Sequence, residues 1–337
     1  MNLPDPAPIA DLIEAFRRSK TMFAATSLGV FDLLAAGPQT ALTLATQLQT
    51  DPDATARLLE ACEGLGLLVS IGRQFANTEI ANVYLVQTSE HALTGYILYS
   101  NDALVALWSH LEDAVREGTP RWRQTFGWPG PIFDHFFSTD AKMRTFIQGM
   151  HGFGVLSSPA VVSAFDLGGF ETIADLGGAT GHLTVAACEA WPQMRGIVFD
   201  MEKVVAVARE YVAKSDTRDR ISFQAGDFFT DPLPPANLYA LGRILHDWHE
   251  DKIGVLLGRI FEALPSSGGL LLAEKLLYDD KSGPVHAQMQ SLNMLVCTEG
   301  KERTLGEYRV LLEAAGFQNI EGKRTGKAVD AVLARKP

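Results

Sequence analysis

The N-terminal third of the chain has the apolar spacing of amphipathic helices. Between residues 9 and 36, apolar side chains recur three and four positions apart, and the pattern ends at a Gly-Pro pair. Residues 43–68 predict two short helices broken at Asp51-Pro52, and the sequence LVSIGRQFANT predicts two short strands. Three helices followed by a two-stranded wing are the element order of a winged-helix module. Helical patterns then continue to about residue 165.

After Phe165 the pattern changes to short apolar runs, each ending near Gly, Asp or a polar cluster. These runs are ETIADLGGATG, MRGIVFD, ISFQAGDFF, NLYALGRIL and GGLLLAEKLL, and the segments between them are compatible with helices. Strands that alternate with helices predict an α/β fold with a mostly parallel sheet and helices on both faces. The final stretch, FQNIEGKRTGKAVDAVLAR, predicts an antiparallel hairpin at one sheet edge. We therefore expect a helical domain at residues 1–160 and an α/β domain at residues 161–337.

The charge of the chain argues against nucleic-acid binding by the predicted winged-helix segment. The formal net charge is −11, and residues 1–100 contain ten acidic and five basic side chains. Proteins bind phosphate backbones through Lys and Arg, so an acidic segment is unsuited to that role. We expect this segment to be a dimerisation or packing module, and we expect no nucleic acid as partner.

Cysteine usage and hydropathy indicate the compartment. The three cysteines, Cys62, Cys188 and Cys297, are far apart and odd in number, so neither a disulfide framework nor a structural zinc site is expected. The first ten residues lack the basic and apolar regions of a signal peptide. No apolar run approaches the roughly 20 residues that span a bilayer. We therefore expect a cytoplasmic protein that does not bind a membrane.

Glycines and acidic residues stand at the ends of three predicted strands. In parallel α/β sheets, ligands bind at the carboxyl ends of the strands, where glycine lets the backbone come close to them. An acid at the end of the second strand can accept hydrogen bonds from ribose hydroxyls. An acid and an aromatic residue at the end of the third can face an adenine. The predicted cofactor-binding residues on this basis are Asp175, Gly177, Gly178, Gly181, Asp200, Asp227 and Phe228.

The first of these loops, DLGGATG, lacks the usual phosphate-binding motifs. It has no Gly-Lys-Ser/Thr sequence of a P-loop, and the strict G-x-G-x-x-G dinucleotide fingerprint is absent. A nucleoside cofactor without a pyrophosphate fits the three strand ends better. S-adenosyl-L-methionine is the commonest cofactor of that kind, with S-adenosyl-L-homocysteine as its product.

The fourth predicted strand leads into a cluster of imidazoles and carboxylates, GRILHDWHEDK at residues 242–252. A substrate hydroxyl whose pKa is near 10, the value of tyrosine, is protonated at neutral pH. A histidine within hydrogen-bond reach can remove that proton, and a carboxylate can fix its tautomer. Glu274 ends the next predicted strand, so we expect it at the same edge of the sheet as His246.

The same stretch can also be interpreted as a metal site. His246 and His249 are one helical turn apart and, with Glu250 or Asp251, could supply three ligands. However, acidic residues at the start of a helix are favoured by its macrodipole. We therefore interpret residues 249–251 as a solvated helix start and expect no metal.

Several motifs together resemble those of one family. The segments LGVFDLL, DLGGATG, FDMEKVV, AGDFFTDPLP, GRILHDW and LNMLVCTEGKERTLGEY, with NTEIANVYL and MHG, are similar to the small-molecule O-methyltransferases of the hydroxyindole (acetylserotonin) group. The likeness extends over nearly the whole chain. It implies a winged-helix dimerisation domain followed by a Rossmann-like methyltransferase domain. It also implies a homodimer that methylates an aromatic small molecule.

The resemblance assigns further roles to individual residues. The histidine of the HDW motif, His246, corresponds to the family's catalytic base, and Glu274 and Glu302 correspond to the two glutamates that flank it. Arg243 and Met201 are implied near the cofactor. The residues implied at the acceptor site are Asp247, Asn293, Cys297 and Met150.

Three positions depart from the family pattern. Ala179 stands where a third glycine of the loop is usual, and Gly154 stands where the hydroxyindole enzymes have an aromatic residue. Cys297 replaces the glutamine of an Asn-x-x-x-Gln pair that addresses the acceptor's amide, and cysteine is a poor hydrogen-bond donor. The expected chemistry is therefore O-methyl transfer, but not to N-acetylserotonin as a named acceptor. The alternatives are a catalytically silent cofactor-binding relative and a methyltransferase for a non-indole natural product.

Overall fold

A computed structural model describes residues 3–130 and 138–337, which form two compact units divided between residues 103 and 104. The predicted division at residue 160 differs from this. Helices between residues 105 and 162 group with the second unit, because Met143 and Ile147 pack against Val204 and Val207. No helix among the described residues is long and apolar enough to cross a bilayer.

The first unit contains the predicted helices and the two-stranded hairpin. Its elements are α1 (Ala7–Leu28), α2 (Val30–Leu34), β1 (Gln39–Thr40), α3 (Ala41–Leu48), α4 (Pro52–Gly64), β2 (Leu68–Ile71), β3 (Gln74–Asn77), α5 (Glu79–Tyr84) and α6 (Thr94–Tyr99), followed by a π-helical turn at Ser100–Leu104. The break at residues 51–52 is confirmed: Asp51 accepts a hydrogen bond from the amide of Ala54, and Pro52 occupies the first helical position. The β2–β3 hairpin lies where the sequence predicts a wing, and β1 extends it to three strands.

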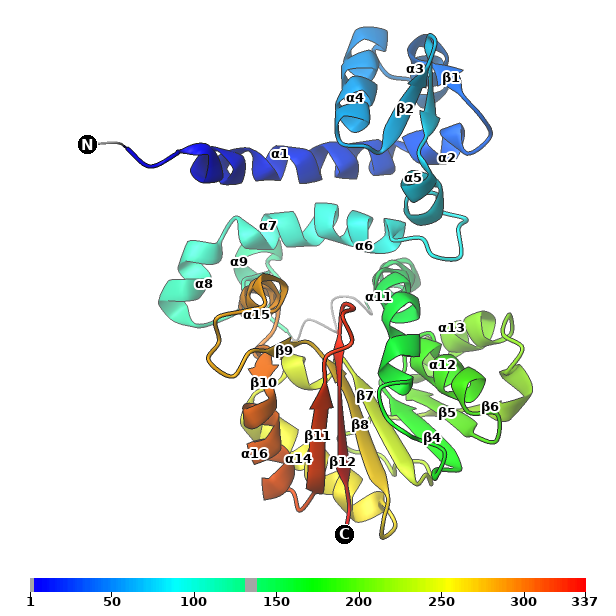
Figure 1. The fold of residues 1–337 in the computed structure, drawn as a ribbon, viewed down its shortest axis with the longest axis vertical. Coiled ribbons are helices and arrows are strands. Elements are labelled where there is room, and N and C mark those ends of the chain that lie inside the picture. Colours follow the sequence, from blue (N-terminus) through cyan, green and yellow to red (C-terminus); the bar gives the residue numbers. More distant parts are fainter. Residues whose placement is uncertain (1–2, 131–137) are drawn as a thin grey trace. The chain divides into compact units, whose positions relative to one another are not determined.

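The second unit is an α/β domain built on a seven-stranded sheet (Figure 1). Its strands, in the order they lie in the sheet, are β11 (Gln318–Lys323), β12 (Asp330–Arg335), β8 (Gly269–Glu274), β7 (Leu238–Gly242), β4 (Thr172–Leu176), β5 (Arg195–Asp200) and β6 (Ile221–Ala225). The five strands from β8 to β6 are parallel, whereas β12 is antiparallel to both of its neighbours. The predicted parallel sheet and the edge hairpin are therefore confirmed.

Helices cover both faces of this sheet (Figure 1). The helices of this unit, not all of which lie on the sheet, are α7 (Val105–Trp108), α8 (Leu111–Glu117), α9 (Trp122–Phe126), α11 (Asp140–Val162), α12 (His182–Ala190), α13 (Glu202–Val212), α14 (Glu250–Ala263), α15 (Val285–Cys297) and α16 (Leu305–Ala314). Two short strands, β9 (Leu276–Leu277) and β10 (Arg303–Thr304), pair in parallel beside the sheet. Short 3₁₀ turns occur at Arg218–Arg220 and Leu245–Asp247.

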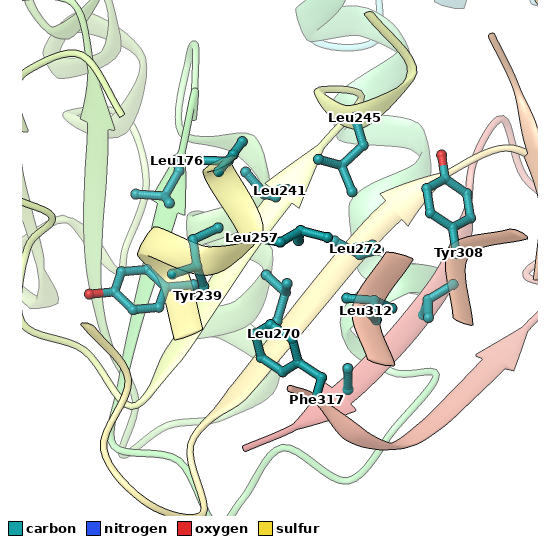
Figure 2. Close-up of a cluster of buried hydrophobic side chains, with 14 of the residues drawn as sticks. Leu176, Tyr239, Leu241, Leu245, Leu257, Leu270, Leu272, Tyr308, Leu312 and Phe317 are labelled. Carbon is teal, nitrogen blue, oxygen red and sulfur yellow. The ribbon is translucent and has the colours of Figure 1, made fainter. Parts of the chain in front are cut away.

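Successive side chains of a strand point to opposite faces of the sheet, because the strand is pleated. In β7, Leu238 and Ala240 pack in the core under α11 and α12, whereas Tyr239 and Leu241 pack in the core under α14 and α16. Figure 2 shows the second of these cores, which is built mainly from leucines of the strands and helices. With both faces filled, the polar residues at the carboxyl ends of β4, β5, β6, β7 and β8 meet at one edge of the sheet.

Candidate active site

His246 lies in a buried group of carboxylates at this edge. Its imidazole is 5% exposed and sits in the 3₁₀ turn after β7. The Nδ1 atom donates a hydrogen bond of 2.7 Å to Glu302 Oε1 and lies 3.7 Å from Glu274 Oε2. The other ring nitrogen, Nε2, lies 3.8 Å from Asp247 Oδ1. Because an ionised carboxylate can only accept, Glu302 keeps a proton on Nδ1, so Nε2 is the nitrogen whose lone pair becomes available when the imidazole is neutral.

Glu274 fixes the backbone that carries the imidazole. It is the last residue of β8 and is fully buried, and its Oε1 atom accepts hydrogen bonds from the amides of Ile244 (3.0 Å) and Leu245 (2.8 Å). The prediction that Glu274 and His246 share one sheet edge is therefore confirmed by their positions. The same carboxylate touches the loop with one oxygen and faces the imidazole with the other.

Glu302 reaches His246 because Gly300 allows two loops to touch. A Cβ atom on Gly300 would overlap the carbonyl oxygen of His246, so only glycine fits there. Arg303, which is 1% exposed, ties the same loops together by donating to the carbonyl oxygens of Leu245 and Trp248, each at 3.1 Å. Sequence reasoning missed Arg303, since a charged residue before a helix gave no sign of burial.

The electrostatics of the group follow from burial and from three carboxylates around one imidazole. Burial lowers the pKa of His246, but Glu302, Glu274 and Asp247 together outweigh it and raise that pKa to about 9. Burial raises the pKa of Glu274 to about 7 and that of Asp247 to about 6, although His246 opposes both shifts. The imidazole is therefore a strong base that becomes neutral only in alkaline solution in the free protein.

The metal interpretation of residues 246–251 does not match the geometry. His249 is exposed at the N-cap of α14, with Glu250 and Asp251 in its first turn, as predicted for a helix start. Glu250 additionally accepts a hydrogen bond of 3.1 Å from the guanidinium of Arg303. Among the described residues, His246, Glu274 and Glu302 bring one potential ligand atom each within 4.8 Å. His246 and Glu302 of this set are already hydrogen-bonded to each other, and the absence of a metal stays a prediction.

The loop after β4 has the shape of a cofactor-binding loop. Gly177 and Gly181 have left-handed φ values of 73° and 78°, and a Cβ on Gly177 would lie 2.6 Å from Ile244. Asp175 is buried beneath the loop and accepts a hydrogen bond from Thr184, and burial raises its pKa to about 7. Asp175 therefore supports the loop from below, whereas Gly177, Gly178 and Gly181 give it the room to approach a ligand.

Asp200 connects the loop to the next strand end. Its two carboxylate oxygens accept hydrogen bonds from the amides of Ala179 (2.9 Å) and Met201 (2.8 Å), and burial raises its pKa to about 6. Ala179 is left-handed, with a φ of 49°. Where a glycine would adopt this conformation freely, Ala179 is held in it by Asp200. The side chain of Met201 is exposed beside this carboxylate.

The third and fourth strand ends contribute Asp227, Phe228 and Arg243. Asp227 is exposed after β6 and caps its own loop by accepting from the amide of Phe229 at 2.8 Å. Phe228 lies against Gly177, within 3.5 Å of where a Cβ would stand. Arg243 follows β7 in a left-handed conformation, and its amide donates to the carbonyl of Ala273. The structure therefore brings all four predicted strand ends to one edge.

The side-chain oxygen of Asn293 is already engaged by two donors. Its Oδ1 atom accepts a hydrogen bond of 2.9 Å from the indole of Trp108 and a longer contact of 3.7 Å from Cys297 Sγ. These two donors orient the amide so that its NH₂ group is left for a ligand. The thiol of Cys297 thus points at Asn293 rather than offering a hydrogen-bond donor to a ligand. Met150 is half-buried on α11, next to His151.

A pair of histidines beside the cofactor loop was not predicted. His151 hydrogen-bonds Thr180 of the loop, and His182, the first residue of α12, hydrogen-bonds Ser158 of α11, both at 2.8 Å. Burial lowers the pKa of His151 to about 4 and that of His182 to about 3, so both are neutral. A Cβ on Gly154 would overlap the His182 ring. The imidazole therefore fills the space that a side chain at position 154 would need.

Comparisons with known proteins agree on one family. Residues 108–318 match an O-methyltransferase domain, and residues 10–87 match an O-methyltransferase dimerisation domain. The chain is 42% identical over 342 residues to acetylserotonin O-methyltransferase of Gallus gallus, with 99% of each chain covered. It is 41% identical to a probable bifunctional dTTP/UTP pyrophosphatase/methyltransferase protein of Homo sapiens, where it spans 54% of that protein's length. The solved structure of human N-acetylserotonin methyltransferase in complex with SAM superimposes with a TM-score of 0.94, at 38% identity, covering 100% and 99% of the two chains.

Proposed function

The chain belongs to the O-methyltransferase family, and we propose that His246 is the base that deprotonates its acceptor. The protein is an S-adenosyl-L-methionine-dependent O-methyltransferase for a hydroxylated aromatic small molecule. The observation that carries the proposal for His246 is its 2.7 Å hydrogen bond to a buried carboxylate at the edge where the cofactor loop ends. That bond leaves Nε2 as the nitrogen that can receive a proton.

The residues at the strand ends suit S-adenosyl-L-methionine. We assign to the carboxylate of Asp200 the hydrogen bonds from the ribose hydroxyls, and to Asp227 and Phe228 the contacts with the edge and face of the adenine. Gly177 and Gly181 let the backbone approach the ligand. When bound, this cofactor supplies an electrophilic methyl group on a sulfonium. We assign the cofactor contacts to these residues and to Gly178, Asp175, Met201 and Arg243.

The chain's own contribution is alignment and proton removal. An in-line displacement is accelerated chiefly by holding the reacting atoms in place. As the acceptor hydroxyl attacks, His246 Nε2 takes its proton, and the resulting imidazolium is stabilised by Glu302 and Glu274. General base catalysis of this kind contributes typically about 10²–10⁴-fold. Asp247, 3.8 Å from Nε2, borders the position of the acceptor.

The acceptor site carries one fixed polar group. With its oxygen held by Trp108, Asn293 offers an amide donor, which suits a carbonyl or other hydrogen-bond acceptor on the substrate. Cys297 supplies an apolar wall in place of a second polar contact, and Met150 is a further candidate. We propose a hydroxyindole or phenol whose side chain makes a single hydrogen bond at this end.

Activity measurements test the base directly. Wild-type protein, His246→Ala and His249→Ala are each incubated with methyl-labelled S-adenosyl-L-methionine and a panel of hydroxyindoles and phenols. We expect label transfer to be at least about 10²-fold slower in His246→Ala. His249→Ala should match wild type, because His249 is an exposed helix-start residue with no role in the proposed reaction. Calorimetry with S-adenosyl-L-homocysteine verifies that each variant is folded. Equal rates for wild type and His246→Ala would contradict the assignment.

We also propose that the chain forms a homodimer through α1. Four apolar side chains on that helix are each more than 60% exposed and recur at helical spacing: Ile9, Leu12, Ile13 and Phe16. Leu12, Ile13 and Phe16 lie at the start of the segment that matches the dimerisation domain, residues 10–87, and Ile9 directly precedes it. Light scattering should show a dimer for wild type and a monomer for the variant with Leu12→Asp and Phe16→Asp. Leu42→Asp, which is similarly exposed on α3, is the matched control.

The cytoplasm is the proposed compartment. Cysteine chemistry supports it: Cys62, Cys188 and Cys297 are buried free thiols, as expected in a reducing environment. Fractionation of cells that express the tagged protein tests this directly, and recovery in an oxidising secretory compartment would contradict it.

A further inference from the structure

Four buried polar atoms around the base have no hydrogen-bond partner within the part of the chain that the structure describes. They are Glu274 Oε2, Glu302 Oε2, Arg303 Nε and Tyr308 Oη. All four side chains are at most 1% exposed. A buried polar group without a partner typically costs about 1–3 kcal/mol, so four in one place require an explanation.

The four atoms are matched in chemistry. The two glutamate oxygens are acceptors, whereas the guanidinium Nε–H and the phenol O–H are donors. A single water held among them would serve all four, since water donates two hydrogen bonds and accepts two. The unpartnered atoms therefore form a complementary set.

Tyr308 reaches this set from a separate element. It lies on α16, fully buried in the core beneath the sheet edge. In Figure 2 its hydroxyl points to the end of the core where Leu245 lies, the residue before His246 and a donor to Glu274. Burial, followed by the charges of Glu274 and Glu302, raises the pKa of Tyr308 well above its usual value. The hydroxyl is therefore a protonated donor that is influenced by the charges of both carboxylates and also by the neighbouring Arg303.

We propose that Tyr308 is a positioning residue for the base, its hydroxyl donating one hydrogen bond, directly or through one water, to the unpartnered Oε2 atom of Glu274 or Glu302. The inference rests on the proposed role of His246. Glu302 bonds the imidazole through Oε1 and Glu274 faces it through Oε2, and Tyr308 steadies these two carboxylates from α16. The hydroxyl touches neither substrate nor cofactor and acts through the two glutamates.

The donor also adjusts the basicity of the group. A hydrogen bond from the hydroxyl stabilises the more negative form, in which His246 is neutral and both glutamates are ionised. Without this hydrogen bond, the set of His246, Glu274 and Glu302 holds its proton more tightly, so the pKa of the set rises. The other charged groups near this set are Asp247 and Arg243 after β7, Arg303 beside Glu302, and His286 on α15.

Tyr308→Phe and Tyr239→Phe form a matched pair of variants. Both residues are fully buried in the same core, but Tyr239 donates to the backbone carbonyl of Pro234, away from the base (Figure 2). For Tyr308→Phe we expect the acid limb of the kcat/KM profile to move up by about one pH unit. The rate should be about tenfold lower on that limb and should recover to within about twofold above it. Tyr239→Phe should leave the limb in place.

An unchanged acid limb in folded Tyr308→Phe would overturn the proposal, because a purely structural role would alter stability without moving the limb. The pKa of the His246 ring, measured by NMR in the cofactor-free protein, gives the same test without turnover. It therefore separates failure of this inference from failure of the proposed reaction. A high-resolution crystal structure of the wild type supplies a readout that needs no variant. The hydroxyl should bond a glutamate oxygen directly or through one water, and a bond only to backbone would overturn the proposal.

Discussion

His246 and Glu302 are joined by a 2.7 Å hydrogen bond, although 56 residues separate them in the chain. The bond forms inside the protein, where both side chains are at most 5% exposed. An ion pair or charge-assisted hydrogen bond is strongest in such surroundings, provided that the remaining polar atoms also find partners. The catalytic proposal therefore depends on Glu302 as much as on the histidine.

Glu302→Gln should reduce kcat by about 10²–10⁴-fold, the range of general base catalysis. The amide can donate to Nδ1, which favours the tautomer with its proton on Nε2 and blocks proton removal. Labelled methyl transfer at saturating substrate measures the effect. Glu299→Gln is the control, because Glu299 lies in the same loop but pairs with Lys252 near the surface. Similar losses in both variants would show that the loop, rather than the carboxylate, is responsible.

The pH profile of kcat/KM should have an acid limb near pH 9, the pKa of His246 in the free protein. His246 accepts a proton only when it is neutral, so activity rises as pH increases through that pKa. Removing one negative neighbour lowers the pKa, so Glu302→Gln should move the limb to lower pH. An acid limb near the ordinary histidine value of about 6.5 in the wild type would contradict the electrostatic argument.

The raised pKa of His246 also makes stability depend on pH. A folded-state pKa of about 9 exceeds the unfolded value of about 6.5, so protonation stabilises the fold. This contribution is fully present below about pH 6.5 and is lost as pH rises through 9. Denaturant unfolding of wild type and His246→Gln should therefore show a stability difference that shrinks between these two pH values. A difference that is constant over the range would contradict the prediction.

Gly300→Ala should reduce catalytic activity more than it reduces the stability of the fold. The new methyl group would overlap the carbonyl oxygen of His246, forcing the loop of Glu302 outward. Overpacking of this kind costs about 1–3 kcal/mol, and loss of the hydrogen bond to His246 should reduce kcat at least about tenfold. Gly306→Ala is the control, since the nearest atom to its Cβ would lie at 3.6 Å and the position is helical. Unchanged activity in Gly300→Ala would show that the loops can separate freely.

Gly154 and His182 should be coupled in a double-mutant cycle. Gly154→Ala alone would press a methyl group into the imidazole ring, at a cost of about 1–3 kcal/mol. In the His182→Ala background the space is open, so Gly154→Ala should be much less costly. Thermal or denaturant unfolding of the four proteins gives the coupling free energy. Additive effects would mean that the ring moves aside without strain.

The sequence predicts most of this framework because local patterns decide it. The alternation of apolar runs and helices after Phe165 predicts the parallel sheet, and the strand ends then bring Asp200, Asp227 and His246 to one edge. Glu274 follows from the same reasoning, because it ends β8. Glu302 follows only from resemblance, since no local pattern shows that Gly300 lets its loop touch His246.

Other features depend on packing that no periodicity encodes. The domain division differs from the predicted one because α11 packs on α13, a contact between distant segments. Gly154 is identified from the sequence as a missing side chain, yet the ring of His182 fills that place from another helix. Arg303 looks like a surface charge but is buried among backbone carbonyls. In each case the neighbour that sets the role is far away in sequence.

The hydrogen bonds from Arg303 to two backbone carbonyls have a consequence for the order of folding. Its guanidinium holds the carbonyl oxygens of Leu245 and Trp248, so the loops of the base meet only after β7, β8 and the segment before α16 have come together. Contacts between distant segments form late, because closing long loops costs entropy before the contact is gained. On refolding from denaturant, the helical signal should return before methyl transfer does. Enzymatic activity is then a reporter for completed assembly of the whole C-terminal sheet.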